Sequence, residues 1–345
     1  MIAIPVLTLV PGVVGGSETY VRELLRSLAR VGEHEYRVLA PPAARDAGGG
    51  LPTLTAEGYG GNRLLAMARG AVSPRYARLI ETADVVHYPL TVPIPRTRTK
   101  SIVTLHDVQH RDLPDLFSRA ERLYRSVAYD RASRRAARVI VISEFVRDRA
   151  IATLGLDPAK VRVVPQGLDH DELVHRREAR EPFLLYPARA WPHQNHATLF
   201  EAFALLRRER PELRLVLTGD DFSSLPDGVE SRGRVARAEL VSLLQHASAL
   251  VFPSFYEGFG LPPLEAMACG CPVACSDAAA LPEVVGDAAR LFDPRDPAAI
   301  AAAVNDVLEQ PAPWVERGLR RAEGFSWDAT ARATDAVYGE LSSRS

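Results

Sequence analysis

The chain has almost no lysine and no excess of charge of either sign. Lys100 and Lys160 are the only lysines among 42 basic residues, and the formal net charge is -1 with a pI near 6.8. We attribute the excess of arginine to codon bias in a GC-rich genome, because selection for phosphate binding would not reach every surface position. The near-neutral balance gives no reason to expect nucleic acid or an anionic membrane as a general partner.

Long apolar runs are also absent. No run approaches the roughly 18 residues that a membrane-spanning helix requires, so no transmembrane segment is predicted. The stretch "MIAIPVLTLVPGVVGG" has no basic region and no clear cleavage site, which indicates a first β-strand rather than a signal peptide. We therefore expect a cytoplasmic protein.

Cysteine is scarce, and the three cysteines, Cys269, Cys271 and Cys275, lie close together. Metal binding is one interpretation, but no fourth ligand lies close by in the sequence. The favoured interpretation is that they are small core residues in a reducing cytosol. We expect no metal site.

What the sequence does contain is two series of short apolar runs separated by helical patterns. The 345 residues suggest two domains. In the first series, "IAIPVLTLV", "YRVLAP", "ADVVHYPL", "SIVTLHD" and "ARVIVISEF" are predicted strands; in the second, "FLLYPA", "LRLVLTG", "SALVFP", "CPVACSD" and "AARLFDP". Strands that alternate with helices favour parallel sheets, so we predict two doubly wound α/β domains.

The connecting segments refine this organisation. The stretch "SETYVRELLRSLARVG" predicts an amphipathic helix with Ser17 as its N-cap and Gly32 as its stop. The segment 41–63 is rich in Gly, Pro and Ala and predicts a long mobile loop. The joint between the domains is expected within residues 163–182. Open α/β sheets bind ligands beyond the carboxyl ends of their strands, so residues that directly follow the predicted strands are candidates for function.

The stretch "PSFYEGFGLPPLEAM" joins a predicted strand to a predicted helix. Its glycines allow a ligand close to the backbone, and the helix start favours an anion such as phosphate. Glu257 and Glu265 could then accept hydrogen bonds from hydroxyl groups on either side of a diphosphate, as in a nucleotide-sugar. Two alternatives remain: a glycine turn with two incidental glutamates, and a glycoside hydrolase pair.

The same region resembles the signature of retaining GT-B glycosyltransferases of glycosyltransferase family 4. The likeness rests on "VFPSFYEGFGLPPLEAMACGCPV" and extends over "GGSETYVRELLRSLA", "VTLHDVQHRDLPDLFSR", "YPARAWPHQNHATLFEAFALL" and "FSWDATARATDAVY". It implies two Rossmann-like domains facing a cleft, an acceptor domain 1–170 and a donor domain 171–325, with a helix 326–345 that crosses back to the first domain. The compact length also resembles actinobacterial antibiotic-pathway transferases of the avilamycin type.

The resemblance assigns roles to individual residues. Glu257, Arg189 and His106 are expected at the catalytic centre, where Glu257 contacts the donor sugar and Arg189 the diphosphate. The expected donor-binding residues are Gly15, Gly16, Gln194, Gly219, Val235, Gly258, Phe259, Gly260, Leu261 and Glu265, the last on the ribose diol. The expected acceptor-binding residues are Asp107, His110 and Tyr124. Arginines within 119–138 could touch an anionic acceptor or membrane, although a solvated helix face is favoured.

The implied reaction moves a sugar, a hexose or another one, from a nucleoside-diphosphate sugar to a hydroxyl of a small-molecule or glycan acceptor, with retention at the anomeric carbon. UDP is the expected nucleotide, and no cofactor is expected. One position departs from the family pattern, because Gln194 stands where a lysine is usual. A non-catalytic sugar-nucleotide-binding subunit therefore remains an alternative. A sugar-nucleotide epimerase, another reaction of the GT-B fold on the same type of donor, is a second alternative. A nicotinamide oxidoreductase is not supported, because "GVVGG" is not a full GxGxxG fingerprint.

Overall fold

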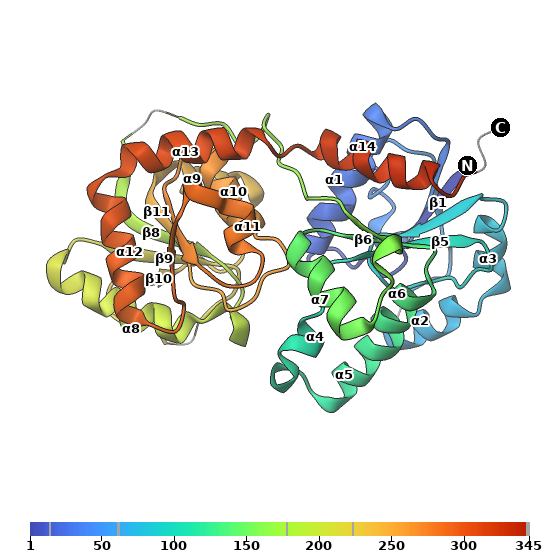
Figure 1. Cartoon of the computed structure of the whole chain (residues 1–345), viewed down its shortest axis with the longest axis horizontal. Helices are drawn as coiled ribbons and strands as arrows, with labels where there is room; N and C mark the ends of the chain where they lie inside the picture. Colours follow the sequence, from blue (N-terminus) through green and yellow to red (C-terminus); the bar gives the residue numbers. More distant parts are fainter. Residues whose placement is uncertain (14, 61–62, 177–178, 223, 343–345) are drawn as a thin grey trace. The chain divides into compact units, whose positions relative to one another are not determined.

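The computed structural model describes residues 1–13, 15–60, 63–176, 179–222 and 224–342. It divides into two compact units, one formed by Met1–Gly167 with Trp327–Ser345 and the other by Leu168–Ser326 (Figure 1). Each unit has its own parallel sheet, and each is described by itself below.

The first unit is built on a seven-stranded sheet in the order β3-β2-β1-β4-β5-β6-β7. Its strands are β1 (Ile2–Pro5), β2 (Tyr36–Ala40), β3 (Thr53–Thr55), β4 (Val85–Tyr88), β5 (Lys100–Leu105), β6 (Arg138–Val141) and β7 (Val161–Val163). Every pairing is parallel. The strand order reverses between β1 and β4, which is the place where sheets of this kind bind ligands.

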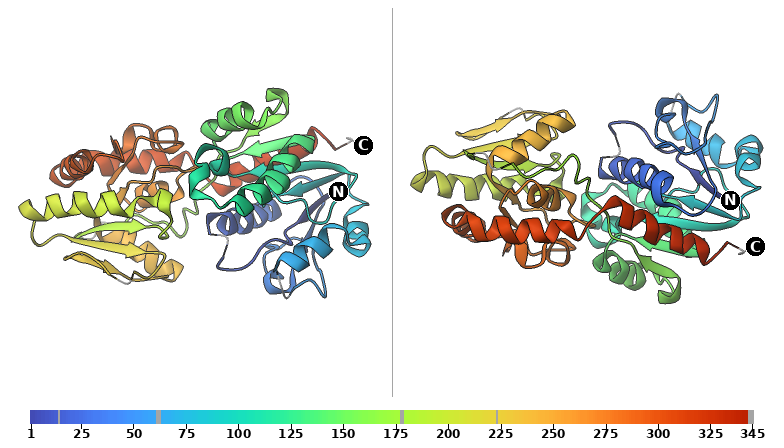
Figure 2. Two further views of the ribbon diagram at one scale, coloured as in Figure 1. Left: turned by 90° about the horizontal axis from the view of Figure 1, so that it is seen from below. Right: turned by 90° about the horizontal axis from the view of Figure 1, so that it is seen from above.

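Helices and helical turns connect these strands. They are α1 (Gly16–Val31), η1 (Pro42–Ala44), α2 (Arg63–Ala71), α3 (Pro74–Ile80), α4 (Gln109–Asp112), η2 (Pro114–Leu116), α5 (Arg119–Arg125), the π-helix η3 (Ser126–Asp130), α6 (Arg131–Arg135), α7 (Glu144–Leu154), η4 (Pro158–Lys160) and α14 (Trp327–Gly339). α14 packs along α1 (Figures 1 and 2). The last helix of the chain therefore belongs to the core of the first unit.

Buried polar groups tie α14 to the sheet. His87, in the centre of β4, bonds through Nδ1 to the hydroxyl of Tyr338 at 2.7 Å and through Nε2 to Thr104 Oγ1 at 2.8 Å. Burial lowers the pKa of His87 to about 3. Both ring nitrogens of the neutral imidazole have hydrogen-bond partners, so no polar atom of the ring is left unsatisfied in the core.

The second unit is built on a six-stranded sheet in the order β10-β9-β8-β11-β12-β13. Its strands are β8 (Glu181–Pro187), β9 (Arg214–Thr218), β10 (Val229–Ser231), β11 (Ala247–Phe252), β12 (Val273–Ser276) and β13 (Arg290–Phe292). All pairings are again parallel. The order reverses between β8 and β11.

Its helices are η5 (Pro192–Gln194), α8 (His196–Glu209), α9 (Arg237–His246), α10 (Leu261–Ala268), α11 (Leu281–Val285), η6 (Gly286–Ala288), α12 (Pro297–Glu309) and α13 (Pro311–Glu323). α8 packs with α12, whereas α10 packs with α9 and α13 (Figures 1 and 2). The prediction of two doubly wound α/β domains is confirmed. The expected cleft between them stays a prediction.

Several local predictions are corrected. Segment 41–63 is not a loop throughout its described part, because η1 and the edge strand β3 lie in it; residues 61 and 62 lie outside the described residues. The pattern missed β3, β7 and β10, each of only three residues. The N-cap of α1 is Gly15 rather than Ser17, although Gly32 does end the helix as predicted.

The three cysteines are buried, as predicted. Burial raises the pKa of Cys269 to about 12 and that of Cys271 to about 11. Protonated thiols in the core are unreactive, because the thiolate is the nucleophilic form.

Candidate functional site

Most of the predicted donor-side residues gather at one edge of the second sheet. β9, β8 and β11 are neighbours and parallel, so their carboxyl ends meet at that edge. Arg189 and Gln194 follow β8, Gly219 follows β9, and Glu257 follows β11. The topology thus brings together residues that lie in three separate parts of the sequence.

The loop between β11 and α10 needs glycine at its last position. Gly260 is the N-cap of α10 with a φ of 112°, a conformation that favours glycine. A Cβ atom at this position would lie 2.6 Å from Cδ2 of Leu281. Gly260 therefore allows both the turn and the close packing that set the direction of α10. Pro262 and Pro263 carry no backbone N–H, so among the first three residues of the helix only Leu261 offers one.

The Glu257 carboxylate is held by an uncharged side chain. Gln194 donates from Nε2 to Oε1 of Glu257 at 3.0 Å, and Tyr186 donates its hydroxyl to Oε1 of Gln194 at 2.8 Å. Gln194 is only 7% exposed and Tyr186 is fully buried. Burial, with a further contribution from the charge of Glu257, raises the pKa of Tyr186 well above its usual value. Tyr186, Gln194 and Glu257 form a chain of hydrogen bonds that starts in the core and ends at the sheet edge.

The backbones that carry Gln194 and Glu257 are also joined. Phe255 N donates to His193 O at 2.8 Å. Asn195, in the left-handed conformation, donates from Nδ2 to the carbonyl oxygens of Pro253 at 3.1 Å and Pro294 at 2.7 Å. The loop after β8 and the loop after β11 are thereby fixed to each other, which keeps the amide of Gln194 at the carboxylate.

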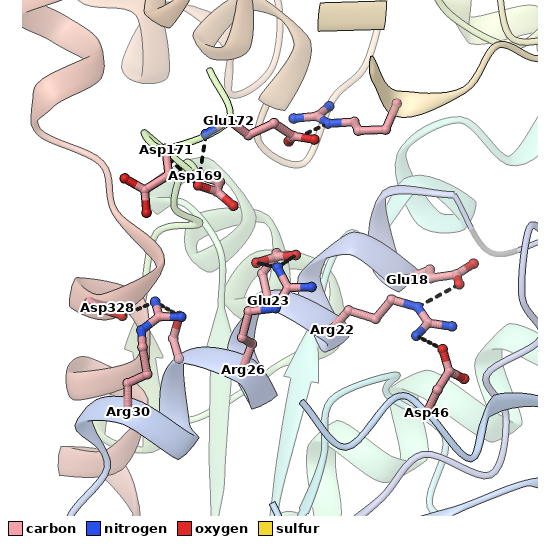
Figure 3. A network of polar contacts seen from close by, with 12 residues as sticks. Glu18, Arg22, Glu23, Arg26, Arg30, Asp46, Asp169, Asp171, Glu172 and Asp328 are labelled. Carbon is pink, nitrogen blue, oxygen red and sulfur yellow. Dashed lines mark hydrogen bonds and ion pairs between the residues drawn. The ribbon is translucent and has the colours of Figure 1, made fainter. Parts of the chain in front are cut away.

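Glu265 has a charged partner instead. It lies in the second turn of α10 and is 8% exposed. Arg237, the first residue of α9, donates to Oε1 of Glu265 at 2.7 Å and to Oε2 of Glu172 at 2.8 Å, the latter drawn in Figure 3. Burial alone would lower the pKa of Arg237, but the two carboxylates raise it well above its usual value. One oxygen of Glu265 is thus already engaged.

Arg189 lies beside an exposed aromatic ring. Its guanidinium carbon is 5.3 Å from the ring centroid of Trp191, which is 48% exposed. Contact with a ring face orients the guanidinium. His196 does not add charge here, because burial lowers its pKa to about 4.

Gly219 has a structural reason for being glycine. Its φ is 118°, and a Cβ would lie 2.8 Å from Ala188 O. The loops after β8 and β9 approach each other at this point, and Asp220 accepts a hydrogen bond from Ala190 N at 3.0 Å. Val235 is half-buried and lies two residues before Arg237, the first residue of α9.

In the first unit, Gly15 and His106 both lie at α1. Gly15 caps the helix with a φ of 59°, and a Cβ on it or on Gly16 would meet nothing within 4 Å. His106 packs edge-on against Tyr20 of α1, with ring centroids 4.9 Å apart. Its Nε2 lies 2.8 Å from Pro89 O and must donate, since a carbonyl only accepts. Burial lowers the pKa of His106, so the neutral ring has Nδ1 as an acceptor.

Charged contacts surround the start of α1 (Figure 3). Glu18 accepts hydrogen bonds from Gly12 N at 2.7 Å and from Arg22 Nε at 2.9 Å, and Arg22 also bonds Asp46 at 2.8 Å. Glu18 thereby fixes the glycine-containing loop that precedes the helix.

The three predicted acceptor residues are placed differently from one another. Asp107 accepts from Gln109 N at 3.0 Å and lies 3.5 Å from Arg125. His110 is 2% exposed and bonds through Nε2 to Asp130 Oδ1 at 2.9 Å. Tyr124 is exposed on α5, and both its ring and that of His110 contact Tyr129. The roles of these residues in acceptor binding stay predictions.

Sequence reasoning missed Tyr186, Arg237 and Asp130. Tyr186 reads as an ordinary strand residue in "FLLYPA", and Arg237 as one arginine among many in "GRVARAEL". Their importance comes from hydrogen bonds to residues outside their own local segment, so no local pattern could have identified them.

Within the described residues, no helix is long and apolar enough to span a membrane. Over the same residues, no group of three His, Cys, Asp or Glu side chains lies close enough together to hold a metal ion.

Comparisons with known proteins agree with the division of the chain. Residues 14–172 match the model "Glycosyltransferase Family 4", and residues 171–322 match "Glycosyl transferases group 1". The chain is similar to the O-antigen chain mannosyltransferase B of Escherichia coli, with 29% identity over 74% of each protein. The MMP alpha-(1->4)-mannosyltransferase of Mycolicibacterium hassiacum and the O-antigen chain mannosyltransferase RfbU of Salmonella typhimurium are matched over 56% and 64% of their own length.

Solved structures show the same architecture. The sucrose-phosphate synthase from Thermosynechococcus elongatus superposes with a TM-score of 0.77 and 21% identity, covering 99% of this chain and 98% of that one. Anabaena Alr3699/HepE in complex with UDP-glucose gives a TM-score of 0.72 with 17% identity over 99% of both chains.

Proposed function

The chain belongs to the glycosyltransferases that join a family 4 domain to a group 1 domain in the GT-B fold, and on that premise we propose its reaction. It transfers a hexose from a nucleoside-diphosphate sugar, UDP being the nucleotide, to a hydroxyl of its acceptor. The anomeric configuration is retained, and no metal takes part. The acceptor belongs to antibiotic or other glycoconjugate biosynthesis.

The observation that carries this proposal is the placement of Glu257 and Glu265 on either side of the start of α10. The N-terminus of a helix attracts a diphosphate through its N–H groups and its dipole. A carboxylate that is already held by hydrogen bonds is well placed to accept further bonds from hydroxyl groups. Glu257 then receives the hydroxyls of the sugar, and Glu265 receives those of the ribose with Arg237 behind it. A fold neighbour that binds UDP-glucose supports the choice of UDP.

The leaving group is stabilised by positive potential from the protein. Arg189 lies on the loop after β8, at the same sheet edge as the start of α10. Its guanidinium can grip phosphate oxygens in a bidentate way, and helix N–H groups can stabilise the charge that develops as the sugar–phosphate bond breaks. The departing phosphate oxygen accepts the proton of the acceptor hydroxyl on the same face of the sugar, so no enzyme nucleophile is required. His106, with Nδ1 as acceptor, accepts a hydrogen bond from a substrate hydroxyl in this proposal.

Gln194 gives this site a neutral partner for Glu257 where a lysine is usual. An ammonium group there would neutralise the carboxylate and add charge for the diphosphate. The amide instead leaves the carboxylate with its full negative charge beside the sugar, where it favours the positive charge that develops at the anomeric carbon. Arg189 then has the larger share in stabilising the leaving group.

The test is a donor screen followed by product analysis. UDP, GDP, UDP-glucose and GDP-mannose are titrated into the purified full chain by calorimetry. The sugar nucleotide that binds most tightly is then incubated with a mixture of polyol and glycan acceptors. We expect a glycosylated product whose anomeric proton coupling in NMR matches that of the donor. Free epimerised donor without acceptor would identify an epimerase. Binding without transfer or hydrolysis would identify a non-catalytic subunit.

A further inference from the structure

A second site lies in the first unit, where α4, η2, α5 and η3 line an open pocket of about 400 Å³. We call it the basic pocket. It is lined by His110, Arg111, Pro114, Arg119, Arg122, Leu123 and Ser126. Its volume falls in the range of small-molecule sites. None of these residues lies in the donor site of the second unit.

Two arginines of the basic pocket have no acidic partner among the described residues. Arg119 and Arg122 are three positions apart on α5 and therefore lie on one face of that helix. The acids in the neighbouring sequence are engaged elsewhere: Asp112 bonds Arg149 at 3.0 Å, Asp107 pairs with Arg125 at 3.5 Å, and Glu121 bonds Ser118 at 2.7 Å. Asp115 is exposed and does not line the pocket. Two like charges side by side are unfavourable without an anion between them.

Arg111 also lines the basic pocket, and its charge is paired with the buried carboxylate of Asp130. Asp130, at the end of the π-helix, is buried and bonds both Arg111 and His110. Burial alone would raise the pKa of Asp130, but these two hydrogen bonds lower it. The carboxylate is thus ionised and fixes both side chains. A π-helical turn is uncommon and frequently marks a functional site, and here it places Asp130 beneath the pocket.

His110 supplies a hydrogen-bonding atom that nothing satisfies. Its Nε2 faces Asp130, and its Nδ1 has no hydrogen-bond partner within the described part of the chain. A buried polar atom without a partner is costly. Nδ1 is buried, so it belongs to the packing beside the pocket and is not counted among the groups that a ligand contacts.

We infer that the basic pocket binds the phosphate group of a small molecule, with Arg119 and Arg122 on the phosphate. The guanidinium fork matches phosphate oxygens. Leu123 and Pro114 give an apolar side against which a sugar or polyol ring can lie. The identification of this molecule as the acceptor rests on the proposed function; the binding of a phosphate ester does not.

The experiment compares three full-length proteins by calorimetry: wild type, the double variant Arg119→Gln/Arg122→Gln, and the control Arg131→Gln/Arg135→Gln. The control removes two exposed arginines of α6 that do not line the pocket. The titrants are glucose 6-phosphate, glucose and inorganic phosphate. We expect glucose 6-phosphate to bind the wild type and the control, and to lose about tenfold or more in affinity in the double variant. Equal binding to all three proteins, or equal binding of glucose and glucose 6-phosphate, would overturn the inference.

A second arm separates two sources of the phosphate. Vesicles of phosphatidylcholine with and without phosphatidic acid are sedimented with each protein. Phosphatidic-acid-dependent sedimentation that the double variant loses assigns the phosphate to a lipid, whereas binding of glucose 6-phosphate alone assigns it to a soluble ester; both outcomes support a phosphate site. UDP is titrated in parallel. If UDP binds and no phosphate ester does, the inference about the basic pocket is refuted and the proposed function is not. If a phosphate ester binds and UDP does not, the proposed function is refuted and the inference about the pocket is not.

Discussion

Gln194 donates a hydrogen bond from Nε2 to Oε1 of Glu257 over 3.0 Å, and this bond links two residues that are 63 positions apart. Tyr186 fixes the far end of the same amide. The position that departs from the family pattern is therefore part of the support of the central carboxylate, and it can be tested directly.

Replacing Gln194 by Leu removes both hydrogen bonds while keeping the size of the side chain. Glu257 then loses the hydrogen bond from the amide, and the Tyr186 hydroxyl is left buried without its side-chain partner. We expect the transfer rate kcat to fall about 10- to 100-fold, which corresponds to the loss of a hydrogen bond to a charged group. Steady-state kinetics with the best donor would measure this, and Gln310→Leu, at an exposed position after α12, is the control. Unchanged kcat would show that Gln194 has no part in placing Glu257.

Replacing Glu257 by Gln keeps the shape of the side chain and removes its charge. We expect a loss of transfer of about 100-fold or more, because the carboxylate stabilises charge that develops in the transition state. UDP affinity should stay within about twofold, since the nucleotide contacts lie on the other side of the diphosphate. Calorimetry with UDP and a transfer assay separate the two effects. Wild-type activity in this variant would contradict the role of Glu257.

The pair between Arg237 and Glu265 makes a prediction about stability. Arg237→Met leaves a largely buried carboxylate without its cation, and we expect a loss of about 1–3 kcal/mol in the free energy of unfolding. Arg214→Met is the matched control, because Arg214 pairs with Glu181 and Glu230 on the surface and should cost about 0–1 kcal/mol. Urea denaturation measures both. Equal losses of unfolding free energy in the two variants would mean that the burial of Glu265 does not make its ion pair more important for stability.

Stability at alkaline pH depends on the buried cysteines. Their thiols have a pKa raised from 9.0 in the usual case to about 11 for Cys271 and about 12 for Cys269. A raised pKa in the folded state means that the contribution to stability is complete below pH 9 and is lost as pH rises towards 12. We expect unfolding free energy to fall above pH 9, and less so after Cys269→Ala/Cys271→Ala. A thiol reagent at pH 8 should label these cysteines only on unfolding; rapid labelling of the native protein would contradict their burial.

The sequence predicted the parts of the fold that depend on local periodicity. Apolar runs located the central strands of both sheets, and the alternation with helices gave their parallel pairing. The strands β3, β7 and β10 escaped notice because each has only three residues, too few for a periodic pattern to be recognised. The N-cap of α1 was placed wrongly because a serine is the usual cap, whereas the chain uses the left-handed freedom of Gly15.

What the sequence by itself determined is the type and order of the elements and the positions of the carboxylates at their ends. Glu257 on a loop and Glu265 on a helix follow from glycine, proline and apolar spacing, which act within a few residues. Only the tertiary structure decided that Gln194 and Tyr186 hold one carboxylate, that Arg237 holds the other, and that Asp130 lies under a basic pocket. These contacts depend on the order of strands and on the packing of helices, so partners far apart in sequence meet only when the chain has folded.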